Sequence, residues 1–376
     1  MAGGGDAHSL TPRARREPLP DALRALALIG VLVVNAMGYQ DVPFGRLLGE
    51  PQPPESALAV GLVALVAAFV QGKAYPVLAF LFGVGMAYAM RGRGRAQAVQ
   101  GARRRARRLL TLGVLHGTLL YFGDILTLYA LCAFWVAWQM HGPWRVLLGR
   151  LRAALAWAIL AVAASTALAF VPFGPARAAT TIGTTAGFVD FVGLNAGTYA
   201  VAQVFGLLLT LPLVRLSMLA GIAAGRLRLL THPRWRALAG QIVRHTVAPA
   251  LAANVAYASA YVGVPPSRPA LSLALESASA LWATPLALVY VALAVQAWHR
   301  RARRWTALLA PLGQHTLSLY IGASLLMALC FSGAGLGWRP TTVQWVLGAL
   351  ALWTLADVAS TVSRGRWPLE AWMARR

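Results

Sequence analysis

Long apolar segments alternate with short basic segments along this chain, from about residue 22 to residue 362. A helix needs about 20 apolar residues to cross the hydrocarbon core of a bilayer, and a soluble protein of this length cannot bury so many such runs. The pattern therefore predicts an all-α, polytopic transmembrane helix bundle. Its apolar segments are 22–40, 56–71, 74–90, 107–122, 124–141, 150–172, 199–225, 244–263, 277–298, 313–332 and 342–362.

The number of crossings depends on how residues 56–90 are interpreted. This stretch is shorter than two full crossings and a turn require, and Gly72, Lys73 and Pro76 interrupt its middle. One broken crossing gives about ten spans with both ends of the chain on the same side. Two crossings give 11 spans and place the amino terminus on the opposite side.

Basic residues favour the ten-span arrangement, because short cytoplasmic loops are enriched in Lys and Arg. With ten spans, 28 of the 34 basic residues fall on the cytoplasmic side and 4 outside, whereas 11 spans leave 25 inside. We therefore expect both termini to be cytoplasmic, with residues 1–20 as a basic tail and 21–376 as one transmembrane domain. The tail lacks a cleavage site after an apolar core, so the first apolar segment is expected to stay in the protein. The eight arginines of 91–108 are cytoplasmic in both versions.

A net charge of +23 would suggest a nucleic-acid partner in a soluble protein. Here the aromatic residues lie inside the apolar segments and do not interleave with the basic runs, which argues against nucleic acid and leaves membrane lipids as the expected partner. The carboxylates are scattered, so no metal site is expected. Cys132 and Cys330 lie in apolar segments as buried thiols, and the longest loop, 173–198, is interpreted as a solvated connector.

Ionisable residues inside membrane spans are costly and are candidates for function. Lys73 is the only lysine of the chain and sits at the break in 56–90. A broken helix at membrane depth is tolerated where it lines protein or water. Lys73 therefore either binds an anionic group such as a phosphate or carboxylate, or is the loop lysine of a tight hairpin.

His116 and Asp124 form the second candidate group. His116 lies near the middle of the segment 107–122, and histidine is the usual general base near neutral pH. Asp124 follows at the outer turn, eight positions later. On an uninterrupted helix this spacing gives about 12 Å of rise, too far for a direct hydrogen bond. The sequence therefore predicts that Lys73, His116 and Asp124 border one cavity, with a structural histidine as the alternative.

The first apolar segment carries Asp21, Arg24 and Asn35. Asp21 and Arg24 have the spacing of a helix ion pair, and Asn35 lies about three turns beyond Arg24 on the same face. These residues are either donor-binding or an ion pair plus a polar contact between helices. Arg215 is expected to reach toward the cytoplasmic surface. Gly83 and Gly85 indicate close helix packing, and His315 is interpreted as structural.

Six motifs in order resemble the YeiB-like family of bacterial membrane proteins, also called domain of unknown function 418. They are DALRALALIGVLVVN (21–35), GKAYPVLAFLFGVG (72–85), RRLLTLGVLHGTLLYFGDILTLYA (107–130), MLAGIAAGR (218–226), GQHTLSLYIGAS (313–324) and RWPLEAW (366–372). The chain departs from the family pattern at Ala25, where Gly is usual, and at Ser318 to Ser324, which lack the family's Asn and Gln.

The resemblance implies a multi-pass protein of the bacterial cytoplasmic membrane. The family's first helices look similar to membrane acyltransferases, which use an Arg near the inner end of this helix and a catalytic His at or beyond its outer end. Arg24 matches the Arg, but residues 36–55 contain no His, so His116 would supply the base. This implies acyl-coenzyme A as a donor substrate, with no tightly bound cofactor, and a small-molecule or glycan acceptor. The alternatives are a small-molecule transporter or exporter using Lys73, His116 and Asp124, and a non-catalytic membrane scaffold.

Overall fold

The described residues of the computed structural model, 17–39, 54–171, 187–265, 267–300, 304–363 and 365–375, form an all-α bundle, which confirms the predicted fold class. Most of the predicted tail, residues 1–16, lies outside them, as do Arg46 and Arg177. The helices are α1 Pro18–Gly38, α3 Ala57–Phe69, α4 Ala74–Met90, α5 Arg95–Leu119, α6 Leu126–Ala137, α7 Trp144–Leu168, α8 Phe188–Phe205, α9 Leu211–Leu227, α10 Arg236–Gly263, α11 Pro269–Ala278, α12 Ala280–His299, α13 Arg304–Gly313, α14 Thr316–Phe331, α15 Thr342–Val362 and α16 Pro368–Ala374. A π-helical turn, Gly206–Thr210, joins α8 to α9, and a 3-10 turn, Pro233–Trp235, precedes α10.

Six helical segments among the described residues are long and apolar enough to cross a membrane, and a seventh if α13 and α14, bent by 63°, count as one span. The chain is therefore a polytopic membrane protein. Three of the ten predicted segments do not meet this criterion. The helix α6 has only 12 residues, while α5 and α10 are too polar on average over a spanning length.

The interruption predicted inside 56–90 is a turn between α3 and α4. Val70 donates its N–H to Val66, Lys73 donates its N–H to Val70, and Gly72 adopts a φ of 78°, which glycine reaches without strain. The two helices together make one candidate span of 34 residues, as expected for one broken crossing. Lys73 is 2% exposed at this break.

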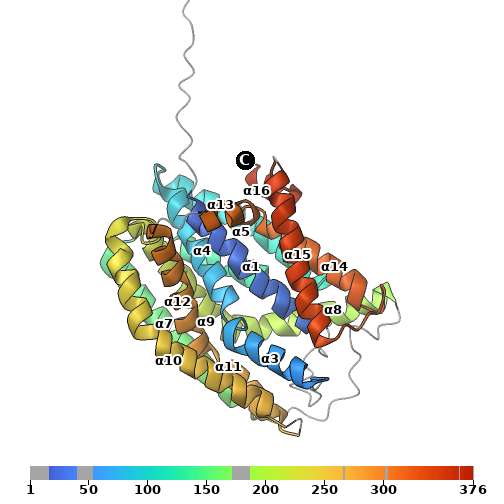
Figure 1. Cartoon of the computed structure of the whole chain (residues 1–376). Helices are drawn as coiled ribbons and strands as arrows, with labels where there is room; N and C mark the ends of the chain where they lie inside the picture. Colours follow the sequence, from blue (N-terminus) through green and yellow to red (C-terminus); the bar gives the residue numbers. More distant parts are fainter. Residues whose placement is uncertain are drawn as a thin grey trace, which may run out of the picture.

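Helix α1 runs through the centre of the bundle, with α4 on one side and α15 on the other, while α10 and α12 form an outer layer (Figure 1). Within its most apolar stretch 78% of α1 is buried, against 22% for α15. Glycines allow the closest contact, between α4 and α9. A Cβ on Gly83 would lie 2.0 Å from the Met218 carbonyl oxygen, and one on Gly221 would lie 1.9 Å from that of Phe80. Gly83 therefore serves close packing, as predicted.

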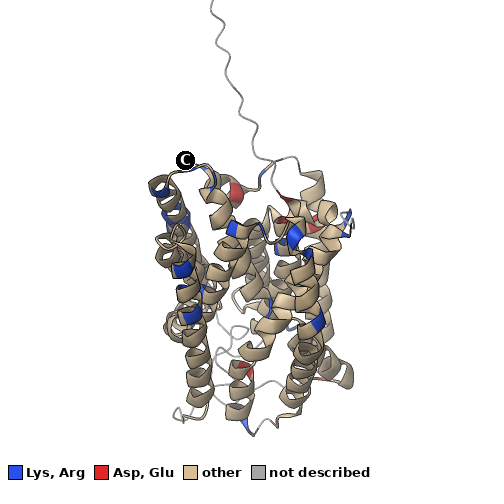
Figure 2. Ribbon diagram, turned by 90° about the vertical axis from the view of Figure 1, so that its left-hand side faces the viewer, with Lys and Arg blue, Asp and Glu red and all other residues tan. Residues whose placement is uncertain are grey.

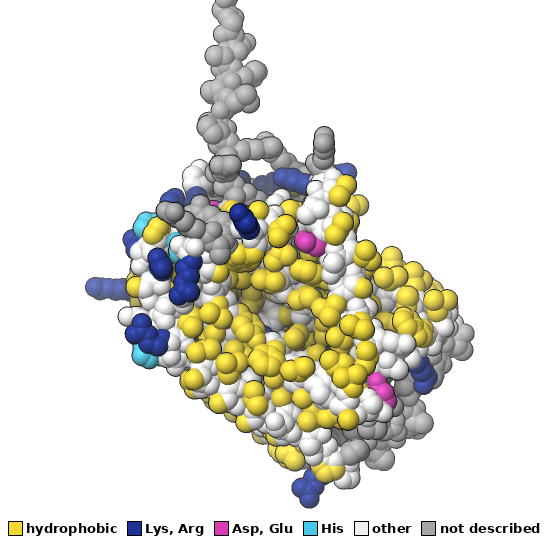
Figure 3. Space-filling model, viewed as in Figure 1, with side chains coloured by type: hydrophobic (Ala, Val, Ile, Leu, Met, Phe, Trp, Pro, Cys, Tyr) yellow, Lys and Arg dark blue, Asp and Glu magenta, His cyan; other side chains and the backbone are white. Residues whose placement is uncertain are grey.

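Lys and Arg gather toward the end of the bundle that holds the carboxyl terminus (Figure 2). We call this the arginine-rich end. Hydrogen bonds from arginines join its parts: Arg91 donates to the Gly225 carbonyl, and Arg108 donates to the carbonyl of Trp372 in α16. The flank seen in Figure 3 is mostly hydrophobic and is hollowed near its middle. Exposed apolar side chains such as Leu160 and Leu347 suit contact with lipid.

The predicted connector 173–198 is wrong in its second half. Residues 172–186 lie outside the described part of the chain, but α8 begins at Phe188. Asn195, expected in a solvated loop, is fully buried in this helix. Asn195 and Thr198 obscured the helix because they are polar but buried, whereas Asp190 in the first turn is exposed.

Candidate functional site

The site is built around a buried pair, His116 near the end of α5 and Asp124 just before α6. His116 Nδ1 lies 2.9 Å from Asp124 Oδ1, and both side chains are fully buried. The prediction that they are too far apart for a hydrogen bond is therefore wrong. That argument assumed a continuous helix, but α5 ends at Leu119 and the chain reverses through residues 120–125.

The end of α5 explains the reversal. The N–H groups of Leu120 and Tyr121 both donate to the His116 carbonyl oxygen, so the last turn widens and the helix does not continue. Gly123 follows in the turn. A Cβ there would lie 2.5 Å from the Tyr121 ring. The turn therefore needs glycine to pack and brings Asp124 back toward the face of α5 that carries His116.

Asp124 is held at both carboxylate oxygens, since Oδ1 faces His116, and also at its backbone oxygen. Its Oδ2 accepts the backbone N–H of Thr127 at 2.8 Å, and its backbone oxygen accepts a hydrogen bond from Gln203 Nε2 at 3.2 Å. Because an ionised carboxylate only accepts hydrogen bonds, His116 Nδ1 carries the proton in this pair. Nε2 is then the ring nitrogen that is left to accept a hydrogen bond.

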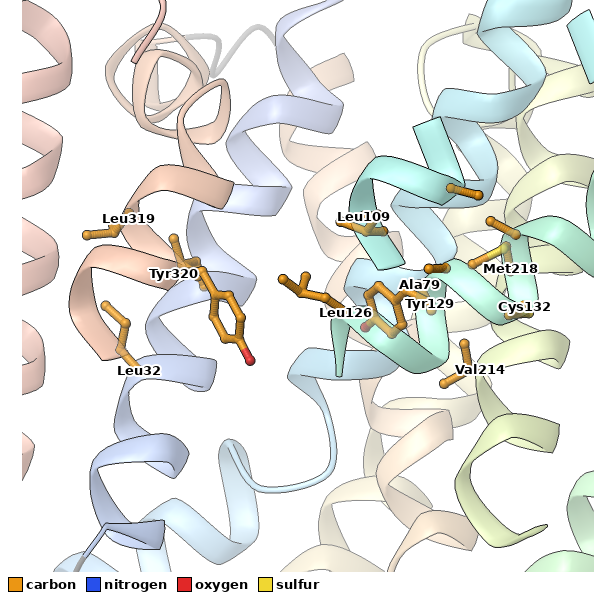
Figure 4. Close-up of a cluster of buried hydrophobic side chains, with 14 of the residues drawn as sticks. Leu32, Ala79, Leu109, Leu126, Tyr129, Cys132, Val214, Met218, Leu319 and Tyr320 are labelled. Atoms are coloured by element: carbon orange, nitrogen blue, oxygen red, sulfur yellow. The ribbon is translucent and has the colours of Figure 1, made fainter. Parts of the chain in front are cut away.

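His116 Nε2 is buried and has no hydrogen-bond partner among the described residues. Aromatic rings surround it: the Tyr320 ring centroid lies 4.7 Å from that of His116, and the Tyr121 centroid lies 6.4 Å away. Figure 4 shows the Tyr320 side chain extending from α14 into the space between α1 and α6. A buried, unpaired basic nitrogen beside an ordered carboxylate is the arrangement of a general base.

Asn35 and Tyr320 form the wall of the site opposite α6. Asn35 is 8% exposed, and the Tyr320 hydroxyl is buried with no hydrogen-bond partner among the described residues. The end of α1 is fixed by Tyr39, whose hydroxyl lies 2.7 Å from the Leu120 carbonyl oxygen and 2.9 Å from that of Ser324, so its one proton is shared between the two acceptors. Helix α14 therefore contributes to the site even though it lacks the Asn and Gln that the family resemblance implies.

Helix α8 supplies residues that the sequence analysis missed. Asn195 Nδ2 donates to the carbonyls of Gly117 and Thr118, the Tyr199 hydroxyl bonds Thr127 Oγ1 at 2.8 Å, and Gln203 holds the Asp124 backbone. Asn195, Tyr199 and Gln203 are spaced by four residues and share one helix face. This four-residue spacing in the sequence indicates one polar helix face. It was not recognised because 173–198 was assigned as a loop.

Lys73 is buried as expected but is held by its own break. Its Nζ donates to the Ala67 carbonyl oxygen at 2.7 Å, and the turn packs against α12, where a Cβ on Gly72 would lie 3.2 Å from Ala283. Among the described residues, no hydrogen bond or ion pair joins Lys73 to His116 or Asp124. The one-cavity arrangement of all three remains a prediction for Lys73.

Asp21 and Arg24 form the predicted ion pair at the arginine-rich end, and Arg24 also donates to the Leu81 carbonyl oxygen at 3.2 Å. Arg24 lines a cavity of about 570 Å3 together with residues of α5, α13, α14, α15 and α16. Its basic members include Arg105 and Arg366. We call it the arginine-lined cavity.

The residues around this cavity include His315, which the sequence analysis treated as structural. His315 Nε2 lies 3.1 Å from the Gly365 carbonyl oxygen, and its ring stacks on Trp367 at 4.9 Å. Glu370 of α16 accepts the N–H groups of Leu317 and Ser318 at 2.9 Å each, at the start of α14. The motif RWPLEAW thus fixes the carboxyl terminus over the cavity.

The other candidate residues lie elsewhere. Arg215 is 8% exposed and its guanidinium lies 4.3 Å from the Trp135 ring, so it packs under an aromatic residue. Cys132 is buried and Cys330 half-buried, both as free thiols. Within the described residues, no three His, Cys, Asp or Glu side chains are grouped so that they can hold a metal ion.

Comparison with known proteins bears on the carboxyl-terminal part. Residues 224–363 match the family described as "Protein of unknown function (DUF418)", which confirms the predicted resemblance over this segment. The chain is 34% identical over 139 residues to the uncharacterized protein YxaH of Bacillus subtilis (strain 168), covering 34% of this chain and 33% of that protein. It is 34% identical over 115 residues to an uncharacterized 39.9 kDa protein from the amylase 3' region of Bacillus acidopullulyticus, covering 30% of each. The chain therefore matches about a third of the length of these relatives. The matched family segment contains Tyr320 but neither His116 nor Asp124.

Proposed function

We propose that this chain is a membrane-embedded acyltransferase in which His116 is the general base and Asp124 orients it. The observation that supports the proposal most is the buried His116–Asp124 pair, whose Nε2 has no partner among the described residues. An orienting carboxylate, an imidazole and an unpaired basic nitrogen are the parts that activate a hydroxyl for acyl transfer.

The reaction would use these groups in one proton cycle. Nε2 of His116 takes the proton from the hydroxyl or amine of the acceptor as its oxygen or nitrogen attacks the thioester carbonyl carbon. The C–S bond then breaks, and the leaving thiolate takes the proton from Nε2. Asp124 stabilises the imidazolium that exists between the two transfers, because its carboxylate stays within hydrogen-bond reach of Nδ1.

The arginine-lined cavity is the proposed donor site. Arg24, Arg105 and Arg366 line it, and guanidinium groups bind phosphates, which coenzyme A carries. Arg24 and Asn35 are 11 residues apart on α1, and Arg105 and His116 are 11 apart on α5, so the cavity and the pair are separated by roughly 16 Å along both helices. A thioester at the end of a long flexible arm, as in acyl-coenzyme A, suits this separation. Lys73 is the remaining candidate for an anionic group of donor or acceptor.

The finer topology belongs to the same proposal. We propose ten spans in the bacterial cytoplasmic membrane, with both termini and the arginine-rich end cytoplasmic. The hydrogen bond from Tyr39 to Leu120 supports two crossings by α5 and α6, because it sets their connecting turn level with the end of α1, which is itself long enough to span. The acceptor, a small molecule or glycan, would then meet the pair from the outer side.

An acyl-transfer assay tests the proposal. Inverted membrane vesicles containing the full chain receive acetyl-coenzyme A labelled in the acetyl group, and label in lipid, glycan and small-molecule fractions is counted. Because loss of His116 destabilises the chain, only variants that elute as the parent does on gel filtration are assayed. We expect transfer by the parent chain, loss in folded His116→Ala and no change in His245→Ala, which replaces an exposed histidine on α10. Equal transfer by His116→Ala and the parent, or by vesicles lacking the chain, would rule out the proposed base.

A further inference from the structure

A second cavity lies between the first half of α5 and the end of α6, away from the His116–Asp124 pair. It measures about 660 Å3 and is lined by Arg95, Ala96, Val99, Gln100, Arg103, Arg107, Phe134 and Trp138. We call it the α5–α6 groove. We propose that this groove binds the headgroup of an anionic phospholipid.

Geometry makes the groove basic along its whole length. Arg95, Arg103 and Arg107 follow one another at multiples of four residues, so they project from roughly one side of α5 over about 18 Å. All three side chains are exposed, and none forms a salt bridge with a described residue. A row of uncompensated guanidinium groups at this spacing can contact a phosphate and a neighbouring headgroup oxygen.

No carboxylate competes for these arginines within the surrounding sequence. Between Ser56 and Asp190 the only acidic residue is Asp124, which is buried against His116. Burial lowers the pKa of the nearby His141, and the positive charges of Arg95 and Arg226 lower it further. An anion that enters the groove therefore meets no negative partner among these residues.

The apolar part of the groove indicates a lipid and not a soluble phosphate. Phe134 lies in the last turn of α6 and Trp138 follows that helix directly, four residues later. The Arg103 guanidinium lies 5.3 Å from the Trp138 ring. Trp138 is 54% exposed, and the nearby Trp135 and Trp144 are also exposed. Tryptophans of this kind concentrate at the level of the lipid headgroups. A basic groove between helices at that level is where anionic headgroups bind.

Native mass spectrometry of the full chain in detergent micelles tests the proposal. The probes are dioleoylphosphatidylglycerol and its zwitterionic counterpart dioleoylphosphatidylcholine, each titrated at low salt. We expect the parent chain to retain phosphatidylglycerol at least tenfold more tightly than phosphatidylcholine. Removing two arginines in Arg103→Gln/Arg107→Gln should weaken phosphatidylglycerol binding by roughly thirtyfold, given the usual contribution of each basic residue near an anionic lipid.

A matched variant separates the groove from general charge. Arg104→Gln/Arg152→Gln removes the same charge from exposed positions that do not line the groove, and its affinity should stay within about twofold of the parent. Equal loss in the two double variants, or equal binding of the two lipids, would overturn the proposal. So would displacement of the lipid by millimolar glycerol 3-phosphate, because that result identifies a soluble-phosphate site.

A second pair guards against a folding defect. If Arg103→Gln/Arg107→Gln does not elute as the parent does on gel filtration, Arg95→Gln/Arg103→Gln replaces it with the same expected loss. Unchanged lipid binding in a folded variant of either pair contradicts the proposal.

Discussion

We predict that the effects of substituting His116 and Asp124 on the free energy of unfolding are not additive. We expect His116→Ala to destabilise the chain severely, and Asp124→Asn added to it to restore part of the loss. The reason is that His116→Ala removes the partner of Asp124 Oδ1, while Oδ2 keeps the Thr127 N–H at 2.8 Å. A buried carboxylate is then left with one of its two oxygens unpaired. A neutral amide at the same position does not carry that penalty.

The magnitudes follow from the burial of both side chains. Removing one partner of a buried charged pair costs about 3–5 kcal/mol. Asp124→Asn alone loses a charge-assisted hydrogen bond of 2.9 Å, about 1.5–3 kcal/mol, but retains an acceptor for Thr127. The double variant should therefore be more stable than His116→Ala alone by about 1–2 kcal/mol, with a coupling energy of about 2 kcal/mol or more.

A double-mutant cycle measures this coupling. The parent, both single variants and the double variant are unfolded by raising the fraction of sodium dodecyl sulfate in dodecyl maltoside micelles, and helix content is followed by circular dichroism. Gel filtration before unfolding establishes that each variant is folded. The reasoning is refuted if the changes in unfolding free energy of the two single variants sum to the change in the double variant within about 0.5 kcal/mol, because independent sites behave in that way.

Three further predictions concern other parts of the chain. In a cysteine-free background, a cysteine at Arg104 should resist a membrane-impermeant thiol reagent in intact cells while one at Arg339 should label, and labelling of the first from outside would overturn the topology. Asn195→Ala should destabilise the detergent-solubilised chain by about 1–3 kcal/mol, since two buried carbonyls at the end of α5 lose their donor, and a change below 0.5 kcal/mol would contradict this role. Gly83→Ala should lower the midpoint temperature of thermal unfolding, because its Cβ would lie 2.0 Å from a backbone oxygen. Gly101→Ala, in open space on α5, should leave this midpoint equal or higher. The reverse order of the two midpoints would contradict the packing at Gly83.

The broad fold was accessible from sequence because it depends on local composition. In lipid, the length of an apolar segment and the position of a polar or glycine residue within it already determine local structure. The helical class, the break at Lys73 and the close packing at Gly83 were therefore predicted correctly. The same reasoning overextended the loop 173–198, because polar residues inside a helix bundle look the same in sequence as polar residues in a solvated loop.

The residues of the site were also partly visible in the sequence. His116, Asp124 and Asn35 were selected because ionisable and amide groups are costly in a membrane interior. Their mutual contact was not visible, since the helical spacing of His116 and Asp124 argued against it. Only the end of α5 at Leu119 and the reversal through Gly123 bring the two side chains to 2.9 Å.

Contacts between distant segments were decided by tertiary structure alone. Tyr320 comes from α14 and Asn195 from α8, and neither position has a local signal that connects it to His116. Hydropathy and charge determine which segments enter the membrane, because the free energy of transferring a segment into lipid depends mainly on its own residues. Which polar side chains meet inside the bundle depends on helix ends, rotations and glycine contacts, and these are set by packing among all the helices at once.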